Sequence, residues 1–96
     1  MVILAFREYG ENLGTRQLGA VARERLLQLL QQDERVVLDF TGVNVVSNSF
    51  ADECVAKVLL EMPLEELKRR TTFRGLNPMA SACMLAAIKR RHLAVA

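Results

Sequence analysis

The sequence predicts an α/β fold with a small sheet of three to four mostly parallel strands and helices mainly on one face. Short apolar runs alternate along the chain with longer segments whose apolar residues recur every three or four positions. Such alternation is typical of parallel strands joined by right-handed helical crossovers. The 96 residues leave room for one domain, residues 1–96, and are too few to cover both faces of the sheet with helices.

The first half of the chain predicts two strands and one long helix. Val2–Phe6 is a short apolar run typical of a buried strand, and the glycines and asparagine of Glu8–Gly14 indicate turn and loop. Thr15 is a suitable N-cap for a helix that reaches about Gln31. Gly19 inside this helix predicts a close approach to the sheet. On the same helix, three arginines are expected to face water: Arg16, Arg23 and Arg25.

The second half begins with Val36–Phe40, an apolar run typical of a parallel strand buried on both faces. A helix is expected from about Phe50 to Met62, with Ser49 and Asp52 as its capping box. Within it, Glu53 and Lys57 form a favourable pair. The remaining expected elements are a short helix from Pro63 to Arg70, a strand at Thr71–Phe73, and a helix capped by Asn77 that runs from Pro78 to about His92.

The candidate functional site follows the second buried strand. Ligands of open α/β sheets gather outside the carboxyl ends of the strands, and the segment that lies there is the richest in polar groups. We therefore expect one rim to bring together Asp39, Thr41, Ser47, Asn48, Ser49, Asp52 and Glu53. A purely structural role, in which Ser49 caps the helix and Asn48 makes a turn, is the alternative. Asp52 and Glu53 would repel a free anion at this helix start.

Several classes of chemistry find no support in the motifs. The sequence has no phosphate-loop motif, no dinucleotide-binding glycine pattern and no nucleophilic triad, so neither catalysis nor a cofactor is expected. Cys54, Cys83 and the single His92 give no metal-ligand spacing, so no metal site is expected. Both cysteines are interpreted as buried free thiols in a reducing compartment. With no signal peptide and no apolar run as long as a membrane span, the prediction is a cytoplasmic protein that is not membrane-bound.

Two basic clusters and one apolar segment bear on possible partners. Lys68–Arg70 and Lys89–Arg91 end predicted helices, where cations are favoured by the helix dipole and stay solvated. Neither cluster is interleaved with aromatic residues, so nucleic acid is not the expected partner; a DNA-associated role for these clusters is a further hypothesis. The helix at Met79–Ile88 has Ser81 as its only polar residue. It either packs in the core or forms a homodimer contact.

The chain as a whole also resembles a known family. The residues that carry the resemblance are Leu13–Arg16 with Gly19, the stretch Asp39–Val43, the step at Leu76–Pro78 and above all Ser49–Glu53. They are similar to those of a family of small STAS-like proteins of unknown function. That family is related to the STAS domains (sulfate transporter and anti-sigma factor antagonist). The resemblance implies a small STAS-like sheet with one strand fewer than a full STAS domain.

The resemblance implies a non-catalytic regulatory module that docks a protein partner, a histidine-kinase-type ATPase, through residues 47–53. In anti-sigma antagonists a serine at the helix start is phosphorylated, and here that position is Asn48. Either the domain docks its partner constitutively, or Ser47 or Ser49 serves as the phosphorylated residue instead. Asp39 would shape the loop, and Thr15 and Arg16 would support the surface. Asp52 and Glu53 would meet a basic partner or pair internally with Arg16. The alternative is a small-ligand or nucleotide-binding domain that uses a strand-end pocket near Asp39.

Overall fold

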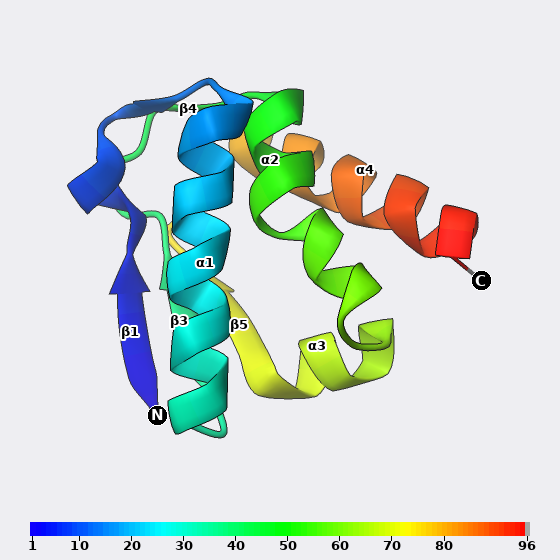
Figure 1. Cartoon of the computed structure of the whole chain (residues 1–96). Helices are drawn as coiled ribbons and strands as arrows, with labels where there is room; N and C mark the ends of the chain where they lie inside the picture. Colours follow the sequence, from blue (N-terminus) through cyan, green and yellow to red (C-terminus); the bar gives the residue numbers. More distant parts are fainter. Residues whose placement is uncertain (96) are drawn as a thin grey trace.

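The computed structural model describes residues 1–95 and consists of short strands and helices in alternation (Figure 1). The strands are β1 (Val2–Ala5), β2 (Asn12–Leu13), β3 (Val36–Asp39), β4 (Val45–Val46) and β5 (Thr71–Arg74). The α-helices are α1 (Arg16–Gln32), α2 (Asn48–Cys54), α3 (Leu64–Arg70) and α4 (Pro78–Val95). Two short 3₁₀ helices are η1 (Phe6–Tyr9) and η2 (Ala56–Leu60).

The main sheet has three parallel strands in the order β1-β3-β5, which confirms the predicted α/β class. A second sheet pairs β2 with β4, also in parallel. Glu8–Gly14 was expected to be turn and loop only, and that expectation was wrong. The Ser47 backbone N–H donates to the Leu13 carbonyl at 2.9 Å, and those of Asn44 and Val45 donate to Glu11. These partners lie too far along the chain for a local pattern to show them.

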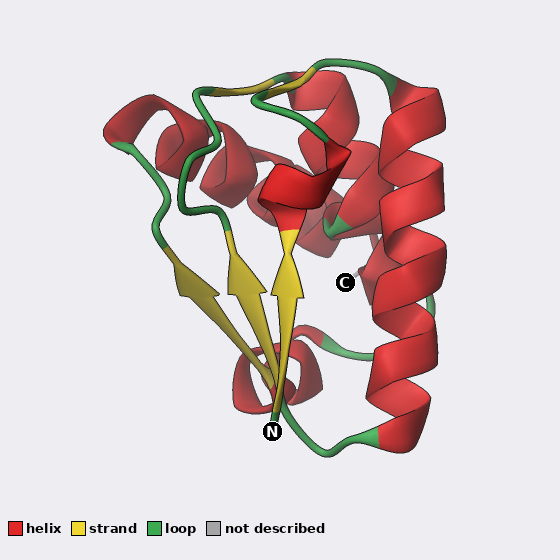
Figure 2. Cartoon of the chain, turned by 90° about the vertical axis from the view of Figure 1, so that its left-hand side faces the viewer, coloured by secondary structure: helices red, strands yellow, loops and turns green. Residues whose placement is uncertain are grey.

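The main sheet buries one face and leaves the other largely open. Leu4 and Leu38 lie opposite one another in the register and are buried beneath the helices. The next residues along the strands point to the other face, where Ile3 and Thr72 on the outer strands are exposed and Val37 on the central strand is buried. In Figure 2, α1 runs along one side of the sheet and no helix lies along the opposite side. The helices therefore lie mainly on one face, as predicted.

Three phenylalanines anchor the start of α2 in the core. Phe6 stacks on Phe40 with 4.2 Å between ring centroids and meets Phe50 edge-on at 6.2 Å. All three side chains are fully buried. Because Phe50 lies in the first turn of α2, this aromatic cluster fixes where that helix begins relative to the sheet.

The position of Gly19 was interpreted wrongly from the sequence: it marks an approach of α1 to α2, and not to the sheet. A Cβ atom at residue 19 would lie 2.9 Å from the Glu53 Cβ and 3.1 Å from the Phe50 carbonyl oxygen. Real Cβ atoms do not come this close to their neighbours. Glycine at this position therefore allows the two helices to lie side by side, as Figure 1 shows.

The second helix differs from its prediction at both ends. Ser47 is the N-cap, because its hydroxyl accepts a hydrogen bond from the Phe50 backbone N–H at 3.0 Å. Ser49 and Asp52 do not form the capping box that was expected. The α-helix ends at Cys54, and η2 follows it instead of a continuous helix to Met62. Ser47 and Ser49 are equally acceptable caps by residue type, so the sequence could not choose between them.

The helix caps of α1 and α4 agree with the sequence. The Thr15 hydroxyl accepts from the Leu18 backbone N–H at 3.1 Å, and the Asn77 amide oxygen accepts from Ala80 at 2.8 Å. α4 continues past His92 to Val95. Within residues 1–95, no helix has the combination of length and hydropathy that crossing a bilayer requires.

The expectation that the basic helix ends are solvated was wrong for Arg70 and Arg91. The Arg70 guanidinium donates to the Leu30, Asp33 and Glu34 carbonyl oxygens at the end of α1. Its side chain is only 18% exposed. Arg91 turns inward to α2, as described below. An arginine can bury the aliphatic part of its side chain while its guanidinium N–H groups donate to backbone carbonyl oxygens or to a carboxylate.

Candidate functional site

The start of α2 has an exposed side and a buried side. Asn48 is exposed, and Ser47 and Ser49 are half-buried at the surface. Phe50 and Ala51, the next two residues, are fully buried. The polar residues of the candidate site therefore lie on a helix turn whose other side is fixed in the core.

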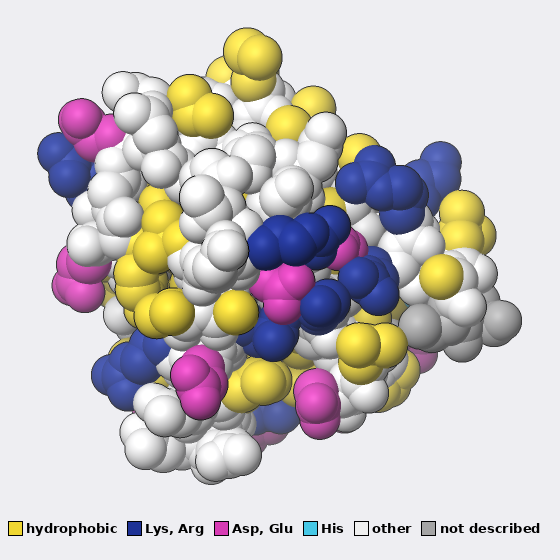
Figure 3. All heavy atoms as spheres, turned by 45° about the horizontal axis from the view of Figure 1, so that its top comes forward, with side chains coloured by type: hydrophobic (Ala, Val, Ile, Leu, Met, Phe, Trp, Pro, Cys, Tyr) yellow, Lys and Arg dark blue, Asp and Glu magenta, His cyan; other side chains and the backbone are white. Residues whose placement is uncertain are grey.

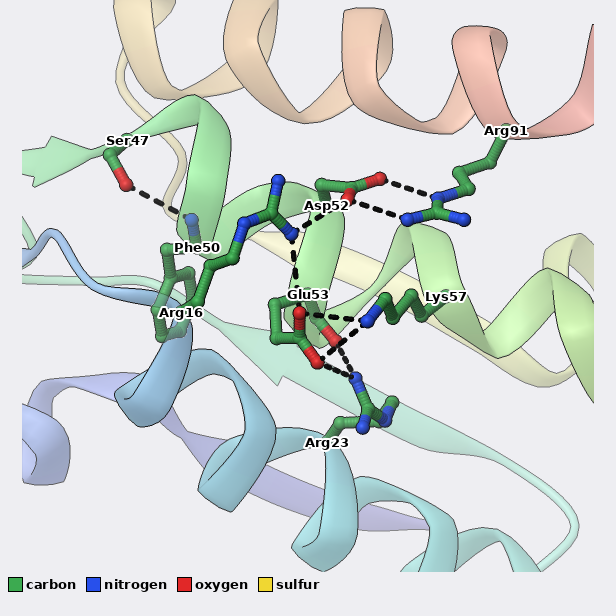
Figure 4. Close-up of polar contacts among 8 residues, drawn as sticks. All are labelled: Arg16, Arg23, Ser47, Phe50, Asp52, Glu53, Lys57 and Arg91. Carbon is green, nitrogen blue, oxygen red and sulfur yellow. Dashed lines mark hydrogen bonds and ion pairs between the residues drawn. The ribbon is translucent and has the colours of Figure 1, made fainter.

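Asp52 is held by two arginines from two other helices (Figure 4). Arg91 of α4 makes a two-pronged contact, with its Nε 2.7 Å from Oδ1 and its Nη2 2.8 Å from Oδ2. Arg16, the first residue of α1, donates to Oδ2 at 2.9 Å. Hydrogen bonds from Arg91, and then from Arg16, hold the pKa of Asp52 well below its ordinary value despite partial burial. Asp52 therefore remains ionised and joins three helices.

Glu53 is paired with three cationic side chains. Its carboxylate lies 2.7 Å from Arg23, 2.9 Å from Lys57 and 3.2 Å from Arg16. Arg23 also donates to the Glu53 carbonyl oxygen. Hydrogen bonds from Arg23 and Lys57 lower the pKa of Glu53 to about 2. At 8% exposure, Glu53 belongs to the interior between α1 and α2.

These contacts correct one expectation. Arg23 was expected to face water, but it turns toward Glu53 and is only 24% exposed. Arg16 is half exposed, as expected, and also pairs with both carboxylates of α2, as the resemblance implied. The cations around Asp52 and Glu53 outnumber these two acids, which bears on the expectation that they repel anions. Arg23 and Arg91 were missed as site residues because their partners lie 30 and 39 residues away. One sequence signal could have indicated the contact between the helices: Arg16 and Arg23 lie on the same side of α1 as Gly19.

A pocket of about 280 Å³ opens beside Asp52, between the start of α2 and the last turns of α4. The residues that line it are Arg16, Asn48, Ser49, Asp52, Arg90, Arg91 and Ala94. Figure 3 shows Lys and Arg side chains around a few acidic ones on this face. Three arginines and one aspartate give the lining two net positive charges. The sequence pointed to Asn48, Ser49, Asp52 and Arg16 but not to the contribution of α4.

Asp39 and Thr41 form a separate cluster at the ends of β3 and β5. Asp39 Oδ1 accepts from the Thr41 backbone N–H at 3.0 Å and from its hydroxyl at 2.7 Å, while Oδ2 pairs with Arg74 at 3.0 Å. The hydrogen bond from Arg74, followed by those from Thr41, lowers the pKa of Asp39 to about 2. Within residues 1–95, no hydrogen bond or ion pair joins this cluster to residues 47–53. The residues predicted for one rim therefore form two polar groups with no hydrogen bond or ion pair between them in the described part of the chain.

Of the two cysteines that were expected to be buried free thiols, only Cys54 is buried. Cys54 is buried behind Glu53, and burial raises the pKa of its thiol to about 12. Cys83 is a half-buried free thiol on α4. In the part of the chain that the structure describes, no three His, Cys, Asp or Glu side chains are grouped as metal ligands would be.

Comparison with known proteins adds one match. A family model described as a STAS-like domain of unknown function (DUF4325) matches residues 19–80, about two thirds of the chain. The chain belongs to this family. Searches of curated proteins and of solved structures found no match. The matched region of this STAS-like chain contains Asn48, Ser49 and Asp52, whereas Arg16, Arg90 and Arg91 lie outside it.

Proposed function

We propose that this STAS-like chain is a non-catalytic regulatory module that docks a protein partner through residues 47–53, which we call the docking surface. The observation that carries the proposal is the rigid presentation of an exposed helix start. Asn48 is exposed, while Phe50 and Ala51 in the same turn of the helix are fully buried in the core. A surface that is already ordered loses little conformational freedom when a partner binds. The family is described only as STAS-like and of unknown function, and the docking role is what the resemblance to STAS domains implies.

The acidic residues of the docking surface have a structural role, because they hold α2 in place against α1. Asp52 and Glu53 are both paired internally, and each is tied to α1 through Arg16. Of the two roles that the resemblance implied for them, internal pairing with Arg16 is the one these contacts favour. The partner would then meet Ser47, Asn48 and Ser49. An ATPase of the histidine-kinase type is the partner that the resemblance implies.

Ser49 is the better candidate for a phosphorylation switch. The Ser47 hydroxyl already accepts the capping hydrogen bond from Phe50. Ser49 lines the arginine-bearing pocket, and its hydroxyl has no hydrogen bond within residues 1–95. A phosphate on Ser49 would add nearly two negative charges beside Arg16 and Arg91 and would compete with Asp52 for them. Modification at Ser49 would thereby change both the charge and the packing of the docking surface.

Docking is tested with a purified histidine-kinase-type ATPase from the same organism. Asn48→Arg places a charged, bulky side chain at the centre of the surface. We expect it to weaken binding by tenfold or more in calorimetry, a loss of about 1.4 kcal/mol. The matched control is Gln31→Arg, which adds the same charge to an exposed position at the far end of α1. Equal binding by the two variants would contradict the proposal.

The switch is tested by incubation with the same kinase and ATP, followed by intact-mass measurement. We expect one added phosphate on the unaltered chain and on Ser47→Ala, and none on Ser49→Ala. Ser47→Ala removes the N-cap and serves as the control for helix stability, with an expected loss of about 1 kcal/mol. Phosphate that persists on Ser49→Ala would exclude Ser49 as the switch.

Self-association through residues 79–88 is a second proposed interaction. Met79 is 81% exposed and Leu85 is 61% exposed on α4, while Ala80, Met84 and Ala87 are buried beneath them. An exposed apolar helix side of this kind favours a contact with another chain. Light scattering across a concentration series tests it, with Met79→Glu as the disrupting variant. A mass of one chain at every concentration would remove this proposal.

A further inference from the structure

The pocket beside Asp52 has more positive charge than its own carboxylate can neutralise. Arg91 pairs with Asp52, Arg16 divides its donors between Asp52 and Glu53, which does not line the pocket, and Arg90 has no hydrogen bond or ion pair within residues 1–95. Three arginines against one aspartate leave two net positive charges around a volume of about 280 Å³. We propose that this pocket binds the phosphate group of a phosphate-bearing anion. The inference goes beyond partner docking and does not depend on it.

The side chains present match phosphate recognition. Arginine presents its donors in a planar fork that suits phosphate or carboxylate oxygens. Arg91 already uses this fork on Asp52, through contacts of 2.7 and 2.8 Å, so the guanidinium is held in a defined orientation. The Asn48 amide and the Ser49 hydroxyl are available as neutral donors on the opposite wall. A phosphate monoester near its second ionisation carries up to two negative charges, which equals the excess in the lining.

The size of the pocket limits the ligand. Pockets for drug-sized molecules occupy ~300–1,000 Å³, and this one lies just below that range. It can therefore enclose a phosphate group and a small substituent, with the rest of a larger ligand outside. The phosphate has two possible sources, a free phosphate ester or a phosphoryl group carried by Ser49.

The first arm of the test is a titration of the unmodified chain with inorganic phosphate and then O-phosphoserine, followed by NMR at constant ionic strength. We expect saturable shifts confined to the amides of the pocket residues. Arg90→Gln removes one positive charge without touching the Asp52 pairs, so it should fold normally and weaken phosphate binding roughly three- to tenfold. The matched control is Arg25→Gln, an exposed arginine on the other side of α1, which should leave the affinity unchanged.

The second arm separates the two sources. Asp52→Asn should tighten phosphate binding, because it releases the donors of Arg16 and Arg91. If the source is a free phosphate ester, Ser49→Ala should still bind free phosphate. If the amide shifts of the pocket residues appear only after Ser49 is phosphorylated, Ser49 is the source. The proposal is overturned if neither free nor Ser49-borne phosphate perturbs the pocket arginines, or if Arg90→Gln and Arg25→Gln bind equally. Docking through Asn48 would stand after such a failure, because it is measured with the partner alone.

Discussion

Asp39 and Glu53 have a similarly lowered pKa, about 2 in each case, yet they are placed very differently. Asp39 closes a local turn with Thr41 and one ion pair with Arg74 at the strand ends. Glu53 is part of α2, lies against α1, and pairs with Arg23 of α1 and Lys57 of η2. The first arrangement orders a few residues of loop, while the second joins two helices. A lowered pKa alone therefore does not show how much of the fold depends on a carboxylate.

The two clusters also differ in charge balance. At the strand ends, one carboxylate meets one arginine, and the turn is neutral. Around Asp52 and Glu53, the cations Arg16, Arg23, Lys57 and Arg91 outnumber the acids. Surplus positive charge next to a pocket is available to a ligand, whereas a balanced pair is not. This difference is why we assign function to α2 and a structural role to Asp39.

Glu53→Gln should have the largest effect on stability. It removes the shared charge from three cations near the α1–α2 contact and leaves their donors only partly satisfied. We expect the free energy of unfolding to fall by about 2–3 kcal/mol, measured by urea denaturation. Glu24→Gln, on the exposed side of α1, is the matched control and should stay within about 0.5 kcal/mol of the unaltered chain. If both variants lost the same stability, the ion pairs of Glu53 would not stabilise the contact between α1 and α2, and Glu53 would not differ from Asp39 in this respect.

Gly19→Ala should have the next largest effect, because it pushes apart the helices that hold Glu53. The new Cβ would meet the Phe50 carbonyl oxygen, which is backbone and cannot rotate away. We expect a loss of about 1–2 kcal/mol in the same assay, since overpacking exceeds the gain in helix propensity. Gly14→Ala has open space around its Cβ and is the control. A stabilised Gly19→Ala chain would show that α1 and α2 can separate without cost.

Asp39→Asn should have the smallest effect, visible mainly as a change in pH dependence. A carboxyl whose pKa is lower in the folded chain stabilises the fold above its unfolded pKa, and that stabilisation is lost as the pH falls through the folded pKa. The window runs from about pH 3.8 down to about 2 for Asp39 and from about pH 4.5 down to about 2 for Glu53. Thermal melts across these windows should show a shallower acid slope for both variants, and the change for Glu53→Gln should begin at a higher pH and be the larger, because the pKa of Glu53 falls further on folding. A slope that changes only in Asp39→Asn would contradict the contrast between the clusters.

The sequence predicted those parts of the molecule that local signals determine. The caps Thr15 and Asn77 and the strands at Val36 and Thr71 follow from residue type and spacing over a few positions. The start of α2 was placed two residues late because two serines compete for one role. The strand at Asn12–Leu13 was missed because it exists only through its pairing with β4.

The candidate site was only half predictable for the same reason. Residues 47–53 stood out because hydroxyl, amide and carboxyl groups follow a buried strand. Arg91 could not be recognised as a site residue from the sequence. A basic residue near the end of a helix is usually solvated, and the carboxylate that Arg91 pairs with lies 39 residues earlier. Asp39 was grouped with α2 by the strand-end rule, yet it bonds to the nearby Thr41 and to Arg74 on the adjacent strand. Charge pairs across helices depend on the tertiary arrangement, which periodicity does not encode.

The contact of Arg70 with the end of α1 bears on the order in which the chain folds. The carbonyl oxygens of the last turn of α1 have no further helical partners, and a guanidinium that follows Leu30 by 40 residues satisfies them. During synthesis α1 is complete long before this residue exists. The final turn of the helix should therefore remain frayed until α3 has formed, and its closure should accompany the docking of β5 against β3 as a late event.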